Sequence, residues 1–486
     1  MTGLLAFDYG NFSSLILKPT IMKFGGTSVE DAKAFERVSR IVRARAGEPT
    51  IVVVSAMSRM TDALLTSVQA ASSGQPEDAL GGLDEHFARH YEVARELLSE
   101  NARVQIESAI ESSREEIGEV LRAVAAHQMP RLLLQDVVVS YGERLSATML
   151  AAVLREGGLE ARYVDARRLI MTNDEHGCAV PLFEETERKT RAALEPLVAA
   201  REVAVLGGFI GSSVESGRTT TLGRGGSDYT AAIVGSCMEA REIQIWTDVN
   251  GVLTADPRVV PSARTVERLS YAEAAELAYF GAKVLHPKTI QPAIDQCIPV
   301  RICNSRAPAE RATLVGAETE TAPRAVKAIA HKTNVTVVQI TAARMLGAYG
   351  FLRALFEVFD RYRTVVDVVT TSEVSVSLTL DDASALASIV RDLRDLGTVL
   401  IEPRRATICV VGEGLRDTPG VAAHVFSTIS DINVSLISLG ASSINLTFVV
   451  DEAHMAEAVA RLHEAFFAEP QLTSPAPEVM HAASEL

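Results

Sequence analysis

The sequence predicts an α/β protein, with a mainly parallel sheet sandwiched by helices, followed by a smaller α+β region that is built twice. The first observation is that continuous apolar runs alternate with helical patterns. Residues 51–55 (IVVVS) form such a run, which is typical of a strand buried on both faces of a parallel sheet. The second observation is an internal repeat beyond residue 323. Because 486 residues exceed one ordinary core, we expect about two to four domains.

The elements of the first part follow in order along the chain. Residues 21–24 predict a short strand, then a Gly-Gly turn and a capped helix that begins near Ser28. A helical pattern resumes after Thr61. Further expected elements are helical segments at 76–126, 135–145 and 270–279, strands at 203–206, 242–246 and 298–302, and a boundary at 307–323. The glycine-rich and polar clusters fall just after predicted strands, which is where α/β sheets bind ligands.

The second part repeats with an offset of 70 residues. Gly350 matches Gly420, and the same offset pairs four further positions. These pairs are Phe356 with Phe426, Ser372 with Ser442, Val374 with Ile444, and Asp381 with Asp451. Each copy predicts a strand, a glycine turn, an amphipathic helix, a strand, a polar turn and a strand. Such a duplication favours a binding or assembly module over a purely structural domain.

Composition and charge exclude several classes of protein. The formal net charge of -15 argues against nucleic acid or an anionic membrane as the main partner. No apolar run reaches the roughly 18 residues that a membrane span needs, and residues 1–21 lack a basic segment typical of a signal peptide. The five scattered cysteines (Cys178, Cys237, Cys297, Cys303 and Cys409) fit reduced thiols. We therefore expect a cytoplasmic protein. We also expect His86 and His90 to lie on a solvated helix surface.

Residues 219–228 (TTTLGRGGSD) carry the strongest local signal for a binding site. Ser227 or Asp228 is a natural helix N-cap, and Gly225 with Gly226 lets the backbone approach a ligand. A helix N-terminus approached in this way favours anions, and Arg224 adds donors that suit a carboxylate or phosphate. Neither the P-loop motif nor G-x-G-x-x-G is present. Taken alone, the stretch favours a capped helix after a flexible turn over a binding site.

A second glycine-rich turn lies near the start of the chain and has the same features as the first. Residues 23–28 (KFGGTS) also precede a predicted helix. Two helix N-termini that face one another across a sheet edge could hold the two ends of a transferring phosphoryl group, and Lys23 would neutralise charge on its oxygens. The pair of turns therefore indicates phosphoryl transfer.

Five motifs together resemble the aspartate kinase (aspartokinase) family. They are residues 23–29, residues 219–228, residues 246–248 with 256–258, residues 280–287 (FGAKVLHP) and residues 371–376 (TSEVSV). The resemblance covers nearly everything from Met22 to about Phe467. It implies an amino-acid kinase fold followed by two ACT domains. It also implies a monofunctional enzyme that uses ATP to convert L-aspartate to 4-phospho-L-aspartate, the first step of lysine, threonine and methionine biosynthesis.

The resemblance implies a domain plan in which the two ACT folds are interleaved. After an N-terminal extension at 1–21, the kinase domain would span 22–315. The first ACT domain would be inserted at 334–398. The second would combine 323–333 with 399–470, before a tail at 471–486.

The resemblance also implies roles for individual residues. Lys23 would stabilise the phosphoryl group and Asp228 would hold this lysine. Arg224 would take a carboxylate of aspartate and Glu143 would face its amino group. The aspartate-binding positions are Thr61, Glu143, Arg224, Gly225, Gly226 and Ser227. The ATP-binding positions are Lys23, Phe24, Gly25, Gly26, Thr247, Asp248, Leu253, Arg258, Lys283 and Val284. The effector-binding positions are Met345, Phe351, Leu352, Val366, Asp367, Ser372 and Glu373. Mg²⁺ would be bound by the ATP phosphates rather than by a metal site of the protein.

Two departures from the family pattern stand beside these assignments. Leu253 replaces a tyrosine that many relatives carry near the nucleotide, and Gly347-Ala348 replaces the His and Ser usual in the lysine-sensitive bacterial branch. The expected effector is therefore lysine or threonine. The ACT domains imply a homodimer, with a tetramer left open.

Two other functions remain as alternatives. One is a related kinase acting on glutamate, carbamate or UMP. The other is a catalytically inactive amino-acid sensor. Glu143 with Arg224 and the duplicated region favour aspartate as the substrate, and intact Lys23, Arg224 and Asp228 favour an active enzyme.

Overall fold

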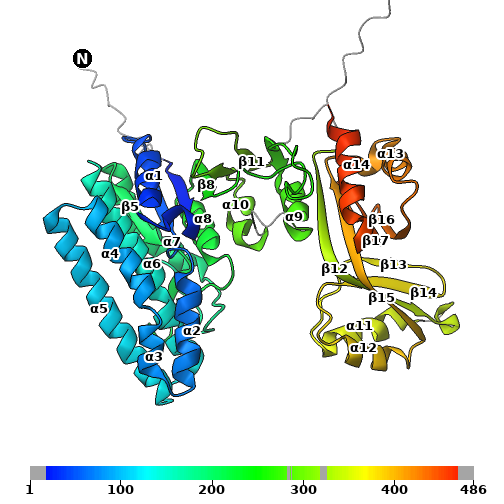
Figure 1. Cartoon of the computed structure of the whole chain (residues 1–486), viewed down its shortest axis with the longest axis horizontal. Coiled ribbons are helices and arrows are strands. Elements are labelled where there is room, and N and C mark those ends of the chain that lie inside the picture. The colour runs from blue at the N-terminus through cyan, green and yellow to red at the C-terminus, as the bar shows by residue number, and fades with distance from the viewer. Residues whose placement is uncertain (1–17, 282–284, 286, 318–325, 348, 469–486) are drawn as a thin grey trace, which may run out of the picture. The chain divides into compact units, whose positions relative to one another are not determined.

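The computed structural model describes residues 18–281, 285, 287–317, 326–347 and 349–468. The chain divides into two compact units (Figure 1). The first unit comprises Met1–Leu253 and Arg264–Pro323, and the second comprises Thr254–Ala263 and Arg324–Leu486. Residues 254–263 thus group with the second unit, although the sequence places them inside the kinase domain.

The first unit is organised around an eight-stranded sheet. Its order is β3 (Ala161–Val164), β5 (Val203–Gly207), β2 (Thr50–Val54), β1 (Thr20–Phe24), β8 (Glu242–Thr247), β10 (Val300–Asn304), β11 (Thr313–Gly316) and β9 (Arg268–Ser270). Every neighbouring pair is parallel except β10 with β11. This arrangement confirms the mainly parallel sheet that the continuous apolar runs predict.

Side chains of β1 alternate between the two faces of this sheet. Met22 and Phe24 join a core with α1 (Ala32–Arg43) and α6 (Arg131–Glu156). The opposite face, with Ile21, carries α8 (Gly226–Cys237). A Cβ added at Gly235 would lie 2.7 Å from Ile243 Cδ1, so α8 lies very close to the strands. By the period of two, Lys23 lies on the α8 face.

Helices fill the segment that the sequence predicts as helical. They are α2 (Met60–Ser72), α3 (Pro76–Gly81), α4 (Asp84–Leu97) and α5 (Glu100–Ala125) (Figure 1). The expectation of a solvated His90 is wrong, because this residue is fully buried on α4. Its Nδ1 lies 2.7 Å from the carbonyl oxygen of His86. Burial lowers the pKa of His90 to about 4, so the ring is neutral.

Two helices begin at residues other than those expected. The 3-10 turn Gly26–Val29 contains Ser28, and α1 begins only at Ala32, where Asp31 Oδ1 accepts from the Ala34 N–H at 2.7 Å. The N-cap of α8 is Gly225, with φ of 74°, rather than Ser227 or Asp228. The Asp228 carboxylate pairs instead with Lys23 Nζ at 2.7 Å.

One helix resembles a membrane span in length and composition. This helix is α6, with 26 residues, and 83% of its most apolar window is buried inside the protein. It packs against α5 and the sheet. Burial in this core accounts for its apolar character.

Smaller elements complete the first unit. They are β4 (Met171–Thr172), β6 (Ile210–Ser213) and β7 (Thr219–Thr221), which form a three-stranded sheet, and helices α7 (Phe183–Ala199), α9 (Tyr271–Tyr279) and α10 (Gln291–Asp295). Ser270 and Glu273 form a capping box at the start of α9. This start agrees with the helix expected at 270–279.

The second unit is a six-stranded antiparallel sheet. Its order is β13 (Val369–Thr371), β14 (Ser375–Leu380), β12 (Ala328–Thr341), β15 (Thr398–Val411), β17 (Asn445–Asp451) and β16 (Val434–Leu439). The central strands β12 and β15 pair along their whole length, with register shifts between Lys332 and Val337. The register shifts separate two folds that share one continuous sheet.

The 70-residue repeat reappears as two matching sets of elements. Helices α11 (Phe351–Arg361) and α12 (Leu386–Leu393) pack on the first fold, and α13 (Val421–Thr428) and α14 (Met455–Phe467) pack on the second. Gly350 and Gly420 are the N-caps of α11 and α13, with φ of 80° and 86°. Glycine tolerates this left-handed conformation at little cost, which explains why both copies carry it.

Candidate functional site

The candidate site is a cavity of about 440 Å³ at the carboxyl ends of β1, β2 and β8. Its lining comes from the turn after β1, the loop after β2, helix α6 and the start of α8. The lining residues are Lys23, Gly25, Gly26, Thr27, Ser55, Ala56, Met57, Ser58, Arg59, Thr61, Asp62, Glu143, Gly225, Gly226, Ser227, Asp228 and Thr247. The two glycine-rich turns therefore face the same cavity.

An ion pair joins the two turns. Lys23 Nζ lies 2.7 Å from Asp228 Oδ1, and the two side chains are only 11% and 18% exposed. Lys23 comes from the central strand of the sheet, and Asp228 from the first turn of α8. A carboxylate in this position is stabilised by the helix dipole. The pair holds one ammonium group at the wall of the cavity.

Unused backbone donors line the same space. The N–H groups of Gly26 and Thr27 on one side, and of Ser227 and Asp228 on the other, have no acceptor among the residues that the structure describes. These groups belong to the first turns of two helices, where donors are left unpaired by the helix itself. Together with Lys23 they form an arrangement that suits a bound polyanion.

Glycines bring the elements of the cavity close together. A Cβ at Gly26 would lie 2.9 Å from the carbonyl oxygen of Ala56. A Cβ at Gly208, just after β5, would lie 2.6 Å from Ser227 Cβ. Gly208 is not among the predicted site residues, although a Gly-Gly pair at the end of a buried strand is a signal of close backbone approach.

Glu143 is a buried carboxyl group in the wall of the cavity. It is 3% exposed, and burial raises its pKa to about 8. Its Oε2 atom is buried and has no hydrogen-bond partner in the described part of the chain. Such an atom is costly unless a ligand pairs with it. Gly142 beside it would place a Cβ 2.8 Å from Ala56 Cβ, so α6 lies directly against the loop after β2.

The other predicted ATP and aspartate positions differ in their placement. Thr61 and Thr247 line the cavity. Phe24 instead faces the core and stacks on Trp246 with ring centroids 5.9 Å apart. Arg224 is exposed and does not belong to the lining described above.

The remaining nucleotide positions lie apart from this lining. Asp248 is exposed and accepts from Thr247 Oγ1 at 3.2 Å. Leu253 is half-buried and bridges to Thr265. Arg258 belongs to the second unit, where its guanidinium pairs with Asp256 at 2.6 Å. The last two ATP-binding positions, Lys283 and Val284, lie outside the described residues.

The loop after β2 belongs to the site, although its residues 55–59 are not among the predicted positions. Residues 55–59 line the cavity, and Arg59 has a left-handed backbone with φ of 67°. The carbonyl oxygen of Ser58 accepts from Arg89 Nη2 at 2.8 Å, which ties the loop to α4. A non-glycine residue with positive φ is uncommon, and sequence patterns do not reveal it.

A second buried carboxylate holds the glycine-rich stretch from behind. Asp136 on α6 has a side chain that is 1% exposed. Its Oδ1 accepts from Thr221 Oγ1 at 2.6 Å, and its Oδ2 accepts from the Gly177 N–H at 3.0 Å and lies 2.9 Å from His176 Nδ1. Because Thr221 leads directly into residues 222–228, Asp136 acts as a positioning residue for the start of α8.

Three of the predicted effector positions contribute to the core of the first repeat fold. Phe351 is buried at the start of α11, and Met345 and Val366 pack against the same core. Leu352, the next residue of α11, is 41% exposed.

Two polar effector positions, Ser372 and Glu373, lie in the β13–β14 turn, and Asp367 lies at the other end of β13, where its N–H donates to the carbonyl oxygen of Thr379 at 3.1 Å. Ser372 Oγ lies 2.8 Å from Ser375 Oγ within that turn, and Glu373 beside it is exposed. The Asp367 carboxylate is largely buried and lies 3.8 Å from Lys332 Nζ. The first fold therefore offers two carboxylates, one buried and one exposed.

Comparisons with known proteins cover nearly the whole chain. The model of the amino acid kinase family matches residues 18–304, and a model of the ACT domain matches residues 408–466. The chain is 38% identical over 456 residues to lysine-sensitive aspartokinase 3 of Escherichia coli (strain K12), across 92% of this chain and 99% of that protein.

Two solved structures of E. coli aspartokinase III are similar to most of this chain. One is the complex with aspartate and ADP (R-state), with a TM-score of 0.77 and 36% identity over 93% of this chain and 100% of that chain. The other is the complex with lysine and aspartate (T-state), with a TM-score of 0.77 and 37% identity over 92% of this chain and 99% of that chain.

Replacing the buried anchor Asp136 tests its role in holding the glycine-rich stretch. In Asp136→Asn one oxygen acceptor becomes a donor, so the contacts of Thr221 or Gly177 are lost at a cost of about 1–3 kcal/mol. We expect a lower melting temperature and a lower kcat/KM. The matched control is Asp174→Asn, whose exposed carboxylate accepts from Ser216 Oγ. Equal melting temperatures for Asp136→Asn and the wild type would contradict the assignment.

Proposed function

The chain belongs to the aspartokinases of the amino acid kinase family, and from that premise we propose how its residues carry out the reaction. The reaction is the ATP-dependent phosphorylation of the L-aspartate side-chain carboxylate to 4-phospho-L-aspartate, the first step of lysine, threonine and methionine biosynthesis. The observation that supports the assignment of the site is the Lys23–Asp228 pair between two sets of unused N–H donors.

The chemical step needs charge stabilisation rather than a base. A carboxylate oxygen of aspartate attacks the γ-phosphorus of ATP, a P–O bond forms, and the bond to the oxygen shared with the β-phosphate breaks to release ADP. The carboxylate is already ionised at pH 7, so no proton has to be removed. Lys23 and the N–H groups of Gly26, Thr27 and Ser227 stabilise charge on the phosphoryl oxygens. Asp228 holds the Lys23 ammonium in place.

We propose that Mg²⁺ binds together with ATP, through the phosphates. The cavity lining contains the carboxyl groups of Asp62, Glu143 and Asp228, and Asp228 is already paired with Lys23. Among the described residues no group of three or more His, Cys, Asp or Glu is placed to hold a metal ion. We propose that the metal is bound mainly by phosphate oxygens and offsets their charge.

Glu143 and Arg224 are the groups we assign to the two ends of aspartate. The unpartnered Oε2 of Glu143 suits the α-ammonium group, which would supply the missing hydrogen bond. Arg224 follows β7 and precedes the helix start, and its exposed fork suits a carboxylate. Thr61, Gly225, Gly226 and Ser227 complete the aspartate side.

The nucleotide side follows from the turn after β1 and the loop after β8. Gly25 and Gly26 lie against the phosphates, and Thr247 lines the same cavity. Phe24, Asp248, Leu253, Arg258, Lys283 and Val284 complete the proposed set for ATP.

We propose lysine as the effector and the first repeat fold as its site. The carboxylates of Asp367 and Glu373 suit an amino acid that carries an extra ammonium group, and E. coli aspartokinase III has been solved with lysine. Gly347 stands where the lysine-sensitive branch usually carries His, so threonine is the competing ligand in the test. Ala348, in the position of the usual Ser, lies outside the described residues. The proposal includes a homodimer through the ACT folds, with a tetramer open, in the cytoplasm.

Removing the Lys23 ammonium tests the catalytic assignment. We expect Lys23→Ala to lower kcat at least about 10²–10³-fold in a hydroxamate assay with aspartate, because a preorganised charge is lost. The control is Lys33→Ala on the exposed side of α1. The double variant Lys23→Met/Asp228→Asn removes the unpaired carboxylate and separates folding from chemistry. A folded and fully active Lys23→Ala would refute the assignment.

The raised pKa of Glu143 predicts a pH dependence. The Glu143 carboxyl keeps its proton up to about pH 8 in the folded protein, and only up to about pH 4.5 in the unfolded chain. Its contribution to the free energy of unfolding is therefore complete at low pH and is lost as the pH rises through 8. Aspartate binding requires the ionised form. We expect kcat/KM for aspartate to rise by up to about tenfold per unit from pH 6 and to level off above pH 8.

The Glu143→Gln variant is the control for this titration. It keeps the shape of the side chain and cannot ionise, so the rise in kcat/KM for aspartate between pH 6 and 8 should disappear. The same rise in wild type and Glu143→Gln would show that another group titrates.

Replacing an exposed carboxylate of the first repeat fold tests the effector site. We expect Glu373→Ala to raise the lysine concentration for half inhibition at least about tenfold without changing uninhibited turnover, because an ammonium partner is lost. The matched control is Glu357→Ala, an exposed carboxylate on α11 that pairs with Arg353. Inhibition by threonine alone would reject lysine as the effector. Unchanged lysine inhibition would remove Glu373 from the site.

A further inference from the structure

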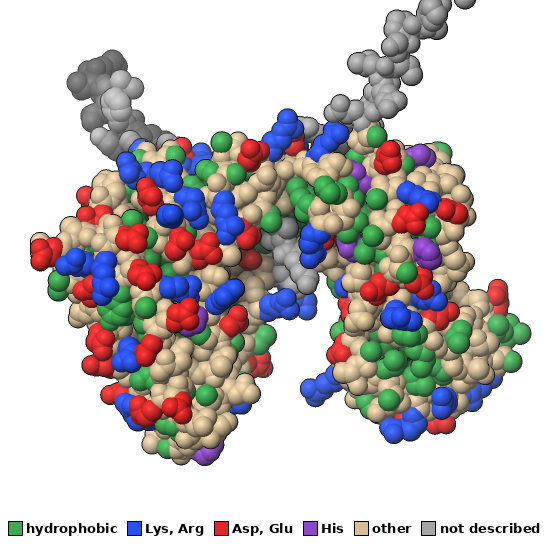
Figure 2. Space-filling model, viewed as in Figure 1, with side chains coloured by type: hydrophobic (Ala, Val, Ile, Leu, Met, Phe, Trp, Pro, Cys, Tyr) green, Lys and Arg blue, Asp and Glu red, His purple; other side chains and the backbone are tan. Residues whose placement is uncertain are grey.

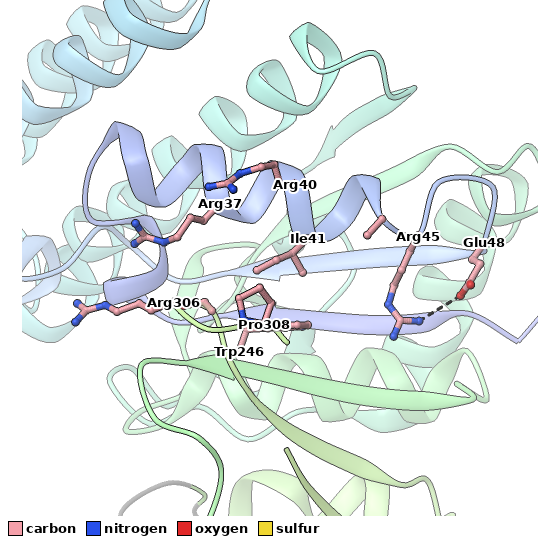
Figure 3. Close-up of a pocket in the computed structure, with 10 residues that line it drawn as sticks. Arg37, Arg40, Ile41, Arg45, Glu48, Trp246, Arg306 and Pro308 are labelled. Carbon is pink, nitrogen blue, oxygen red and sulfur yellow. Dashed lines mark hydrogen bonds and ion pairs between the residues drawn. The ribbon is translucent and has the colours of Figure 1, made fainter. Parts of the chain in front are cut away.

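A second cavity, of about 520 Å³, lies on the sheet face opposite α8. Its walls are α1 and its C-terminal turn, Trp246 at the end of β8, and the segment after β10 that contains Ser305 and Pro308 (Figure 3). The cavity shares no lining residue with the candidate active site. None of the roles proposed above uses it.

The lining of this cavity is strongly basic. It contains Arg37, Arg40, Arg45 and Arg306 against a single carboxylate, Glu48, in a chain with a net charge of -15. Figure 2 shows Lys and Arg side chains gathered over the region of α1. Positive charge concentrated in this way on an acidic protein favours an anionic ligand.

Two of the arginines have no partner among the described residues to neutralise them. Arg45 pairs with Glu48 at 3.2 Å, and Arg306 pairs with Glu30 at 3.0 Å. Arg37 and Arg40 form no side-chain ion pair or hydrogen bond with the described residues, and the Nε atom of Arg37 is buried without an acceptor. A buried donor in this state costs about 1–3 kcal/mol, which a bound acceptor would recover.

The rest of the lining is apolar. Ile41 and Ala44 come from the α1 side, and Trp246 and Pro308 close the opposite side (Figure 3). A volume of this size fits a small organic molecule. We propose that the cavity binds a small organic anion, whose carboxylate or phosphate pairs with Arg37 and Arg40 and whose apolar part contacts Ile41, Trp246 and Pro308.

The bound anion would contact residues that hold the turn after β1, which is the turn assigned to the ATP phosphates. Ser305 Oγ lies 2.8 Å from Ser28 Oγ and donates to the carbonyl oxygen of Thr247 at 3.0 Å. The Gly25 N–H donates to the carbonyl oxygen of Trp246 at 3.1 Å. A ligand that moves Ser305 or Trp246 therefore acts on the turn assigned to ATP. Because such coupling is reciprocal, ATP and the anion alter one another's affinity.

The chain supplies its own reporter for a binding experiment. Trp246 is its only tryptophan and lines the cavity. Tryptophan emission is followed during titration with hexanoate, hexyl phosphate and inorganic phosphate, with ADP present to fill the catalytic site. We expect saturable changes with hexanoate or hexyl phosphate, and at least tenfold weaker binding of inorganic phosphate. A preference between the first two identifies the acid group.

Matched variants of α1 decide whether the binding occurs in this cavity. We expect Arg37→Gln and Arg40→Gln each to weaken binding at least tenfold, and Arg43→Gln, an exposed arginine outside the lining, to leave it unchanged. Thermal melts establish that all three variants fold. No saturable change with any probe, or equal affinities in the three variants, overturns the proposal. These readouts are independent of turnover.

The coupling to the active site has its own test. With the organic anion bound, the KM for ATP should shift, and Ser305→Ala should reduce this shift while the anion still binds. A KM for ATP that is the same with and without the saturating anion overturns the coupling.

Discussion

The ion pair between Lys23 and Asp228 is the contact on which the catalytic unit depends. A lysine that is 11% exposed requires a partner, because an isolated buried charge is far more costly than a paired one. The partner is available only because α8, which begins after its N-cap Gly225, packs against the face of β1 that carries Lys23. One interaction therefore joins the centre of the sheet to the start of a helix and leaves an ammonium group beside a cavity.

The cavity depends on how closely the surrounding elements approach. Gly26, Gly142 and Gly208 each stand where a Cβ would lie less than 3 Å from a neighbouring atom. Close packing of this kind excludes water, which raises the pKa of Glu143 and leaves its Oε2 without a hydrogen-bond partner among the described residues. The same dryness strengthens every electrostatic contact inside the site. Asp136 contributes from behind by holding the approach to α8.

The second unit couples two folds through shared strands. Strands β12 and β15 run through both, so the first core and the second core are built on one hydrogen-bonded ladder. Residues 399–402 pair with 337–340 of the inserted fold, although the sequence assigns them to the second fold. A ligand that alters the first fold therefore acts on strands that also support the second. This shared sheet gives effector binding a physical route through the unit.

The sequence by itself determined the parallel sheet, the two glycine-rich turns and the 70-residue repeat, because these are written in local periodicity and in residues with special backbone freedom. Only the tertiary structure decided which groups pair. Ser28 could not be excluded as a helix cap without its contact to Ser305, 277 positions away. Likewise, the burial of His90, the anchoring by Asp136 and the raised pKa of Glu143 depend on distant segments that remove water from these side chains.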